Sequence, residues 1–169
     1  MLDLKPEKLR RKISRRLGKM PIDNILSPDA IVPLAKAANE HSITTTLSKK
    51  ASDLYEIENS QISDAIRKQT PGALQHISTG VAILHITLPT QKPPRAVFAR
   101  LAHCIEFTAG NHEPFDLVIL LVTGKSKSNQ HLQLLAEISR LFRDKGLCSK
   151  LRGSTTSDAM YALLTGHSD

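Results

Sequence analysis

The feature that most restricts the fold is the stretch FDLVILLV, at Phe115 to Val122, whose last six residues are all apolar. Eight residues suit a strand better than a helix, and the run shows no alternation of polar and apolar side chains. A strand that is apolar on both sides is typical of the centre of a sheet covered on both faces. The chain therefore has to provide other strands beside this run and helices above and below it.

A helix is predicted directly after this strand. The loop GKSKSN, residues 124–129, contains Ser128, which is a suitable N-cap, and an apolar face follows. We expect this helix to end near Lys145-Gly146, with the glycine supplying a left-handed exit. The residues expected on its apolar face are Leu132, Leu135, Ile138, Leu141 and Phe142.

The rest of the chain alternates strand-like and helix-like segments. With 169 residues and 40% apolar side chains, the length favours one domain with one core. We therefore predict an α/β fold: a single domain in which a central mixed sheet carries helices on both faces. The expected elements are strands at Gly80–Leu88 and Arg95–Leu101, helices at Ala35–Ala51, Asn59–Lys68 (capped by Ser60) and Ser157–Leu164, a turn or helix start at Ser27-Pro28-Asp29, and a break at Pro71-Gly72.

The positive charge is concentrated at the N-terminus. The formal net charge is +7, and residues 1–20 contain eight Lys or Arg against two acidic residues. Residues 21–169 hold the remaining fifteen basic and fourteen acidic side chains, so this predicted domain is nearly neutral. Leu9, Ile13, Leu17 and Met20 form an apolar stripe, which predicts a basic helical arm. The arm either packs on its own domain or binds an anionic lipid surface or nucleic acid, and its lack of aromatic residues favours the former.

Two classes of protein are disfavoured by the composition. The longest apolar run, Leu117–Val122, falls far short of the roughly 20 residues that span a bilayer, so we expect a cytoplasmic protein. The only cysteines, Cys104 and Cys148, lie far apart and outside any metal-binding motif, which argues against a zinc site or disulfide framework. We expect both thiols to be buried.

Two histidines stand out by position. His85 lies within the apolar stretch GVAILHITLP, and His131 falls in the first turn of the helix that follows Phe115–Val122. Ligands of α/β sheets bind beyond the carboxyl ends of the strands, where helix N-termini favour phosphate. If His85 lies on a neighbouring strand, one ring can attack a phosphoryl group while the other donates to its oxygens. Position alone leaves open the alternative that His85 is a core residue with a hydrogen-bond partner.

Longer segments resemble a known family. The chain from Pro21 to Leu164 resembles the enzyme IIA domain of the mannitol/fructose class of the sugar phosphotransferase system, and in particular its nitrogen-regulatory branch. The segments that carry this resemblance are VFARLAHCIEF (97–107), EPFDLVILLV (113–122), HLQLLAEISRLFRDKGLCSKLRGS (131–154) and SDAMYALL (157–164).

The resemblance implies a catalytic pair. The family's phosphoryl-accepting histidine ends a stretch of the form G-I-A-I-P-H, which matches Gly80–His85, and its second active-site histidine opens the His-Leu helix, which matches His131. An HPr-like phosphocarrier is then the expected donor, with no cofactor or metal. A transporter or sensor kinase is the expected regulated partner, in nitrogen or potassium regulation.

The sequence also departs from the family pattern around His85. Leu84 replaces the family's proline, Ile86 replaces a small residue, and LQHISTG at 74–80 replaces a glycine-rich loop. Gln69-Thr70 stands where the family has an Arg-Glu pair. We expect the two branched side chains to crowd the histidine and the lost arginine to weaken phosphate binding. His76, in the altered loop, could enter the pocket, whereas His41, His103, His112 and His167 are expected to be surface or loop residues.

Three functions remain open from the sequence. The first is phosphoryl transfer through His85. The second is a regulatory binding module that has kept the fold and lost the transfer. The third is a nucleic-acid or membrane-surface protein that binds through residues 1–20.

Overall fold

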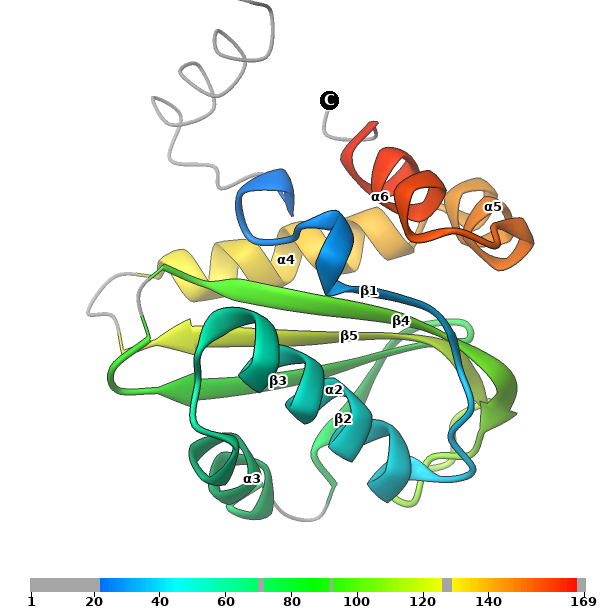
Figure 1. The fold of residues 1–169 in the computed structure, drawn as a ribbon. Helices are drawn as coiled ribbons and strands as arrows, with labels where there is room; N and C mark the ends of the chain where they lie inside the picture. The colour runs from blue at the N-terminus through cyan, green and yellow to red at the C-terminus, as the bar shows by residue number, and fades with distance from the viewer. Residues whose placement is uncertain (1–21, 70–71, 92, 126–128, 167–169) are drawn as a thin grey trace, which may run out of the picture.

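The structure, a computed structural model, describes residues 22–69, 72–91, 93–125 and 129–166. The predicted basic helix at residues 1–20 and the predicted cap Ser128 lie outside these ranges. Within them, Figure 1 shows one sheet with helices on both sides, which confirms the predicted single-domain α/β fold.

Five strands form the sheet, in the order β1-β4-β5-β3-β2. β3 runs parallel to β5 and β1 runs parallel to β4, whereas the β4–β5 and β2–β3 pairs are antiparallel, so the sheet is mixed. The strands are β1 (Ile31–Ala35), β2 (Leu74–Ser78), β3 (Val81–Leu88), β4 (Arg95–Ile105) and β5 (Phe115–Gly124).

Helices cover both faces of this sheet. In Figure 1, α2 and α3 lie on one side and α4, α5 and α6 on the other. Their bounds are α2 (Glu40–Tyr55), α3 (Asn59–Arg67), α4 (Gln130–Phe142), α5 (Lys145–Gly153) and α6 (Ser157–Gly166), preceded by the short 3₁₀ helices η1 (Ile22–Asn24) and η2 (Pro28–Ala30).

The predicted central strand is the centre of the core. Every residue from Leu117 to Val122 is at most 1% exposed, and β5 is flanked by β4 and β3. Burying each such aliphatic side chain stabilises the fold by roughly 1.5–3 kcal/mol. The prediction from FDLVILLV is confirmed.

The N-terminal part differs from the predicted single helix at Ala35–Ala51. A short edge strand, β1, ends at Ala35, and the helix begins only at Glu40. Asn39 accepts a hydrogen bond from the Ser42 backbone N–H, and Ser42 Oγ accepts from the Asn39 N–H, so this pair forms a reciprocal cap. That capping box starts the helix at Glu40, with four residues between it and β1.

The C-terminal part also contains one more helix than predicted. α4 ends at Phe142, and Asp144 then caps α5 by accepting from the Leu147 N–H at 3.1 Å. Gly146 lies inside α5, so the predicted left-handed exit there is wrong. The buried face of α4 consists of Leu134, Ile138 and Phe142, whereas Leu132 is 55% exposed.

Two further predictions are corrected. α3 begins at Asn59, with Glu58 at the N-cap and no side-chain capping bond, so Ser60 lies inside the helix. Cys148 is buried as expected, but Cys104 is exposed near the end of β4.

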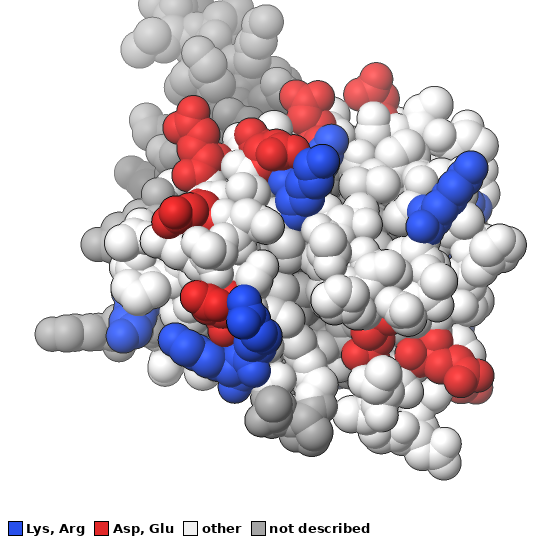
Figure 2. All heavy atoms as spheres, turned by 60° about the horizontal axis from the view of Figure 1, so that its bottom comes forward, with Lys and Arg blue, Asp and Glu red and all other residues white. Residues whose placement is uncertain are grey.

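On the face drawn in Figure 2, basic and acidic side chains are interspersed, and no extended patch of one sign appears. This distribution agrees with the nearly neutral composition of residues 21–169. That face therefore has no field of a single sign that would steer a charged partner toward it.

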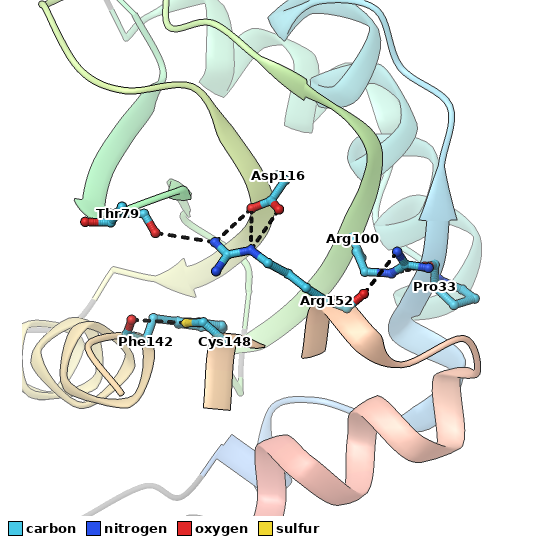
Figure 3. A network of polar contacts seen from close by, with 7 residues as sticks. All are labelled: Pro33, Thr79, Arg100, Asp116, Phe142, Cys148 and Arg152. Atoms are coloured by element: carbon cyan, nitrogen blue, oxygen red, sulfur yellow. Dashed lines mark hydrogen bonds and ion pairs between the residues drawn. The ribbon is translucent and has the colours of Figure 1, made fainter. Parts of the chain in front are cut away.

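An ion pair connects Arg152 of α5 to Asp116 at the start of β5 (Figure 3). Arg152 Nε lies 3.0 and 2.8 Å from the two carboxylate oxygens of Asp116, and Nη2 donates to Asp116 Oδ1 at 2.9 Å. Nη2 also donates to the Thr79 carbonyl in the β2–β3 turn. Gly80 completes this turn with φ +74°, and a Cβ built there would lie 2.5 Å from Arg152 Nη2.

Replacing Gly80 should therefore destabilise the protein. Gly80→Ala forces a side chain into the left-handed region and against Arg152, and we expect the free energy of unfolding to fall by about 1–2 kcal/mol. Chemical denaturation measures this change. Gly166→Ala is the matched control, because a Cβ at Gly166 meets nothing within 4 Å. An equal loss in both variants would contradict this role for Gly80.

Candidate functional site

His85 lies in the second half of β3, on the face of the sheet that α4 covers. Phe98 stacks on Phe142 of α4 with ring centroids 5.8 Å apart, and Phe98 is the cross-strand partner of Ile119. Ile119 pairs in turn with Ile83. Because partners share a face and successive residues alternate, His85 points to the same side as Ile83. The sheet thus presents the His85 ring toward α4.

His131 approaches His85 from the first turn of α4. The two ring centroids lie 6.4 Å apart with an interplanar angle of 23°. β3 and β5 run parallel and in register from Val81↔Leu117 to Leu88↔Gly124, and α4 follows β5 after a short loop. The structure therefore brings together the two histidines that the sequence singled out, near the carboxyl ends of two parallel strands.

Thr123 makes a direct side-chain contact to His85. His85 Nε2 and Thr123 Oγ1 form a hydrogen bond at 2.9 Å, and Thr87 Oγ1 lies 3.4 Å from Thr123 Oγ1. Thr123 is 2% exposed. Our sequence prediction missed this residue, although a threonine closing an otherwise apolar strand was a signal.

The environment of His85 disfavours its charged form. Burial is the main cause that lowers its pKa below the ordinary value of 6.5, and the positive charge of His131 lowers the pKa further. A neutral imidazole keeps one ring nitrogen with a free lone pair, which a nucleophile needs.

The expected crowding of His85 by its chain neighbours is wrong. Leu84 and Ile86 are both fully buried, and strand alternation directs them to the opposite face, toward α2 and α3. The side chains that share the face of His85 are Ile83 and Thr87, and Thr87 is exposed. The two residues that differ from the family pattern therefore pack in the core behind the sheet, on the opposite face from the ring.

The Gln69 side chain is hydrogen-bonded to the backbone of β3 at His85. Its side-chain Nε2 donates a hydrogen bond to the backbone carbonyl of His85. An amide at this position positions the backbone but carries no charge, so it supplies none of the positive charge that the family's Arg-Glu pair would bring. Thr70 lies outside the described residues.

His76 belongs to a different cluster. Its ring stacks on His112 at 4.6 Å and 2°, and it meets Phe107 edge-on at 6.1 Å. His76 pairs with Ala82 near the start of β3, whereas His85 lies farther along the same strand. The structure thus places His76 with the segment that leads into β5. His41, His103 and His112 are exposed, as expected, and His167 lies outside the described residues.

Two further features are absent from the described part of the chain. It contains no group of three or more His, Cys, Asp or Glu side chains arranged to hold a metal ion. None of its helices is both long enough and apolar enough to cross a membrane.

Comparison with known proteins identifies the family. Residues 24–167 match the family described as phosphoenolpyruvate-dependent sugar phosphotransferase system, EIIA 2. The chain belongs to this family. The nitrogen regulatory protein of Bradyrhizobium diazoefficiens is 32% identical over 145 residues, which cover 86% of this chain and 95% of that protein. The nitrogen regulatory protein of Escherichia coli is 31% identical over 91 residues, covering 53% of this chain and 55% of that protein.

Solved structures of the enzyme IIA family share the fold. The nitrogen regulatory protein IIA-Ntr from Neisseria meningitidis superposes with a TM-score of 0.77 at 19% identity, covering 85% of this chain and 99% of that one. Enzyme IIA mannitol from Escherichia coli gives 0.66 at 18% identity, covering 82% and 98%. The resemblance inferred from the sequence, including its nitrogen-regulatory branch, is confirmed.

The lowered pKa of His85 predicts how its ring titrates. By NMR, the midpoint of the His85 ring should lie below 6.5. In His131→Gln it should rise and still remain below 6.5, because burial, the larger cause, persists. His103→Gln, at an exposed position on β4, is the matched control and should leave the midpoint unchanged. A wild-type midpoint at or above 6.5 would contradict the account.

The same shift predicts a dependence of stability on pH. Below pH 6.5 the unfolded chain binds a proton at this position more readily than the folded chain does. The stability contributed by neutral His85 is therefore complete above 6.5 and falls as the pH drops toward the folded pKa. Denaturation curves should show that His85→Gln weakens this dependence; an unaltered slope would count against it.

Proposed function

We propose that His85 accepts a phosphoryl group from the phosphohistidine of an HPr-like carrier, and that His131 stabilises the group during transfer. The observation that carries the proposal is the meeting of the two rings, at 6.4 Å between centroids, near the carboxyl ends of β3 and β5. Membership of a phosphotransferase family supports the reaction class.

The chemistry needs few components. A neutral His85 attacks the phosphorus, and charge on the phosphoryl oxygens peaks in the transition state. A ring N–H of His131, held in the first turn of α4, is suitably placed to donate to those oxygens, and the N-terminus of that helix adds a favourable dipole. The residues present require neither metal nor cofactor for these steps.

The biological output proposed is regulatory. The relatives with sequence similarity over most of this chain are named nitrogen regulatory proteins. A phosphoryl group on His85 would add close to two negative charges beside the neutral side chains of Thr123 and Thr87. A transporter or sensor kinase that docks against His85 would distinguish the two states by that charge.

Transfer can be tested by reconstitution. Incubation with enzyme I, an HPr-like carrier and phosphoenolpyruvate should add one acid-labile phosphoryl group, detected by mass spectrometry, and His85→Ala should abolish it. His131→Gln should lower the transfer rate about 100-fold, since one stabilising donor is lost. His41→Ala, on the exposed side of α2, is the matched control and should behave as wild type.

The alternative of a binding module without transfer predicts a different pattern. The wild type would then gain no mass, and a captured partner would bind His85→Ala and His85→Asp equally. Under our proposal the partner responds to the negative charge of His85→Asp. Phosphorylation that persists in His85→Ala would place the acceptor elsewhere and overturn the proposal.

A further inference from the structure

A phosphoryl group on His85 would need positive charge beside it. Such a group carries close to two negative charges at neutral pH, and the side chains of lysine and arginine pair with it most strongly. Gln69, which contacts the backbone of β3 at His85, is a neutral amide. The hydroxyl groups beside the ring, on Thr123 and Thr87, are neutral as well. His131 supplies one donor, so the site calls for a further cation at the same edge of the sheet.

We propose that Lys125, the residue that follows β5, is the cation that pairs with the phosphoryl group on His85. This inference rests on the proposed function, because it requires a phosphoryl group at that ring. Lys125 is exposed, so its side chain can turn toward an incoming group without disturbing the core.

Strand alternation directs Lys125 to the face of His85. The Thr123 side chain lies on that face, since its Oγ1 is 2.9 Å from His85 Nε2. The next residue, Gly124, pairs with Leu88 and shares its face, which is the opposite one. The chain then returns Lys125 to the side of Thr123. Two residues of strand span about 7 Å, a distance that the four-carbon stem of lysine can cover.

A backbone contact fixes the end of β5 from the opposite face. A Cβ built at Gly124 would collide with the Gln91 carbonyl oxygen, so the β3–β4 turn packs directly against this glycine. The Gln91 N–H donates to the Leu88 carbonyl at 3.2 Å, which closes the turn. Lys125 therefore follows a strand end that is held in place on the face opposite His85.

The start of α4 lies at the same place. In Figure 1, β5 ends and α4 begins at the same edge of the sheet. Four residues, 126–129, separate Lys125 from α4, whose second residue is His131. Lys125 and His131 are thus positioned to contact one phosphoryl group from the two ends of one short connection.

The transfer step leaves Lys125 chemically unchanged. The N–P bond to the donor ring breaks while a bond to His85 forms, and the electron pair of the broken bond stays on the donor ring. Lysine is an ammonium group at neutral pH and keeps its protons throughout, so it contributes charge alone. Because the negative charge on the phosphoryl oxygens persists after transfer, the pairing favours the phosphorylated state as well as the transition state.

Phosphorus NMR tests this pairing. We phosphorylate His85 with the carrier system and, in a parallel sample, with phosphoramidate, and we identify its resonance by its loss in His85→Ala. A cation beside the group favours the dianion, so the titration midpoint of the phosphoryl group should rise by about 0.5 pH unit in Lys125→Gln. Lys125→Arg should keep the wild-type midpoint. Lys49→Gln, which removes an exposed lysine from α2 on the other side of the sheet, is the matched control and should also keep it.

Salt provides a second readout that a purely structural role would not change. An exposed ion pair is screened by salt. The difference in midpoint between wild type and Lys125→Gln should therefore shrink as the ionic strength rises from about 0.01 M to about 1 M. A difference that is the same at both ionic strengths would contradict a direct ion pair.

The outcomes separate the role of Lys125 from the proposed function. An unchanged midpoint in Lys125→Gln would refute the pairing and leave transfer to His85 intact. If phosphoramidate phosphorylates His85 and the carrier does not, a higher midpoint in Lys125→Gln would support the pairing while the carrier-dependent function fails. The absence of a phosphoryl group on His85 with either donor would refute both.

Discussion

The parallel, in-register pairing of β3 with β5 is the constraint on which the site depends. It sets His85 beside Leu121 and Thr87 beside Thr123, so a polar group on one strand meets a polar group on the next. Because both strands end at the same edge, the helix that leaves β5 has to start beside His85. A shift of one residue would turn the His85 ring to the opposite face, among the core side chains under α2 and α3.

The core and the chemistry are therefore parts of one arrangement. The apolar interior of β5 makes the pairing with β3 strong, and it also removes water from one side of His85, which lowers the pKa of that ring. Polar side chains enter only at the strand ends, through Thr123, Thr87 and the helix that carries His131. The protein holds a neutral, oriented imidazole by burial and hydrogen bonds, with no ion pair to that ring among the described residues.

Much of this could be predicted from the sequence, and the exceptions have physical reasons. FDLVILLV identified the central strand because continuous apolar character leaves few alternatives, and His85 and His131 followed from motif positions. β1 was missed because it is a five-residue edge strand with a proline in its middle. The separation of α4 from α5 depends on Asp144, whose side chain caps α5 by accepting from the Leu147 N–H. Good helix formers lie on both sides of Asp144, so the sequence pattern does not show that one helix ends and another begins there. The prediction that Leu84 and Ile86 crowd the His85 ring was wrong because it treated residues adjacent in sequence as adjacent in space. In a strand, the side chains of consecutive residues point to opposite faces of the sheet.

The central claim is that His85 and His131 act on one phosphoryl group. The most direct measurement is a crystal structure of the protein after phosphorylation by the carrier system. We expect a phosphoryl group bonded to the His85 ring, with one of its oxygens within hydrogen-bond distance of a His131 ring nitrogen. A phosphoryl group on any other residue, or one on His85 that His131 does not contact, would contradict it.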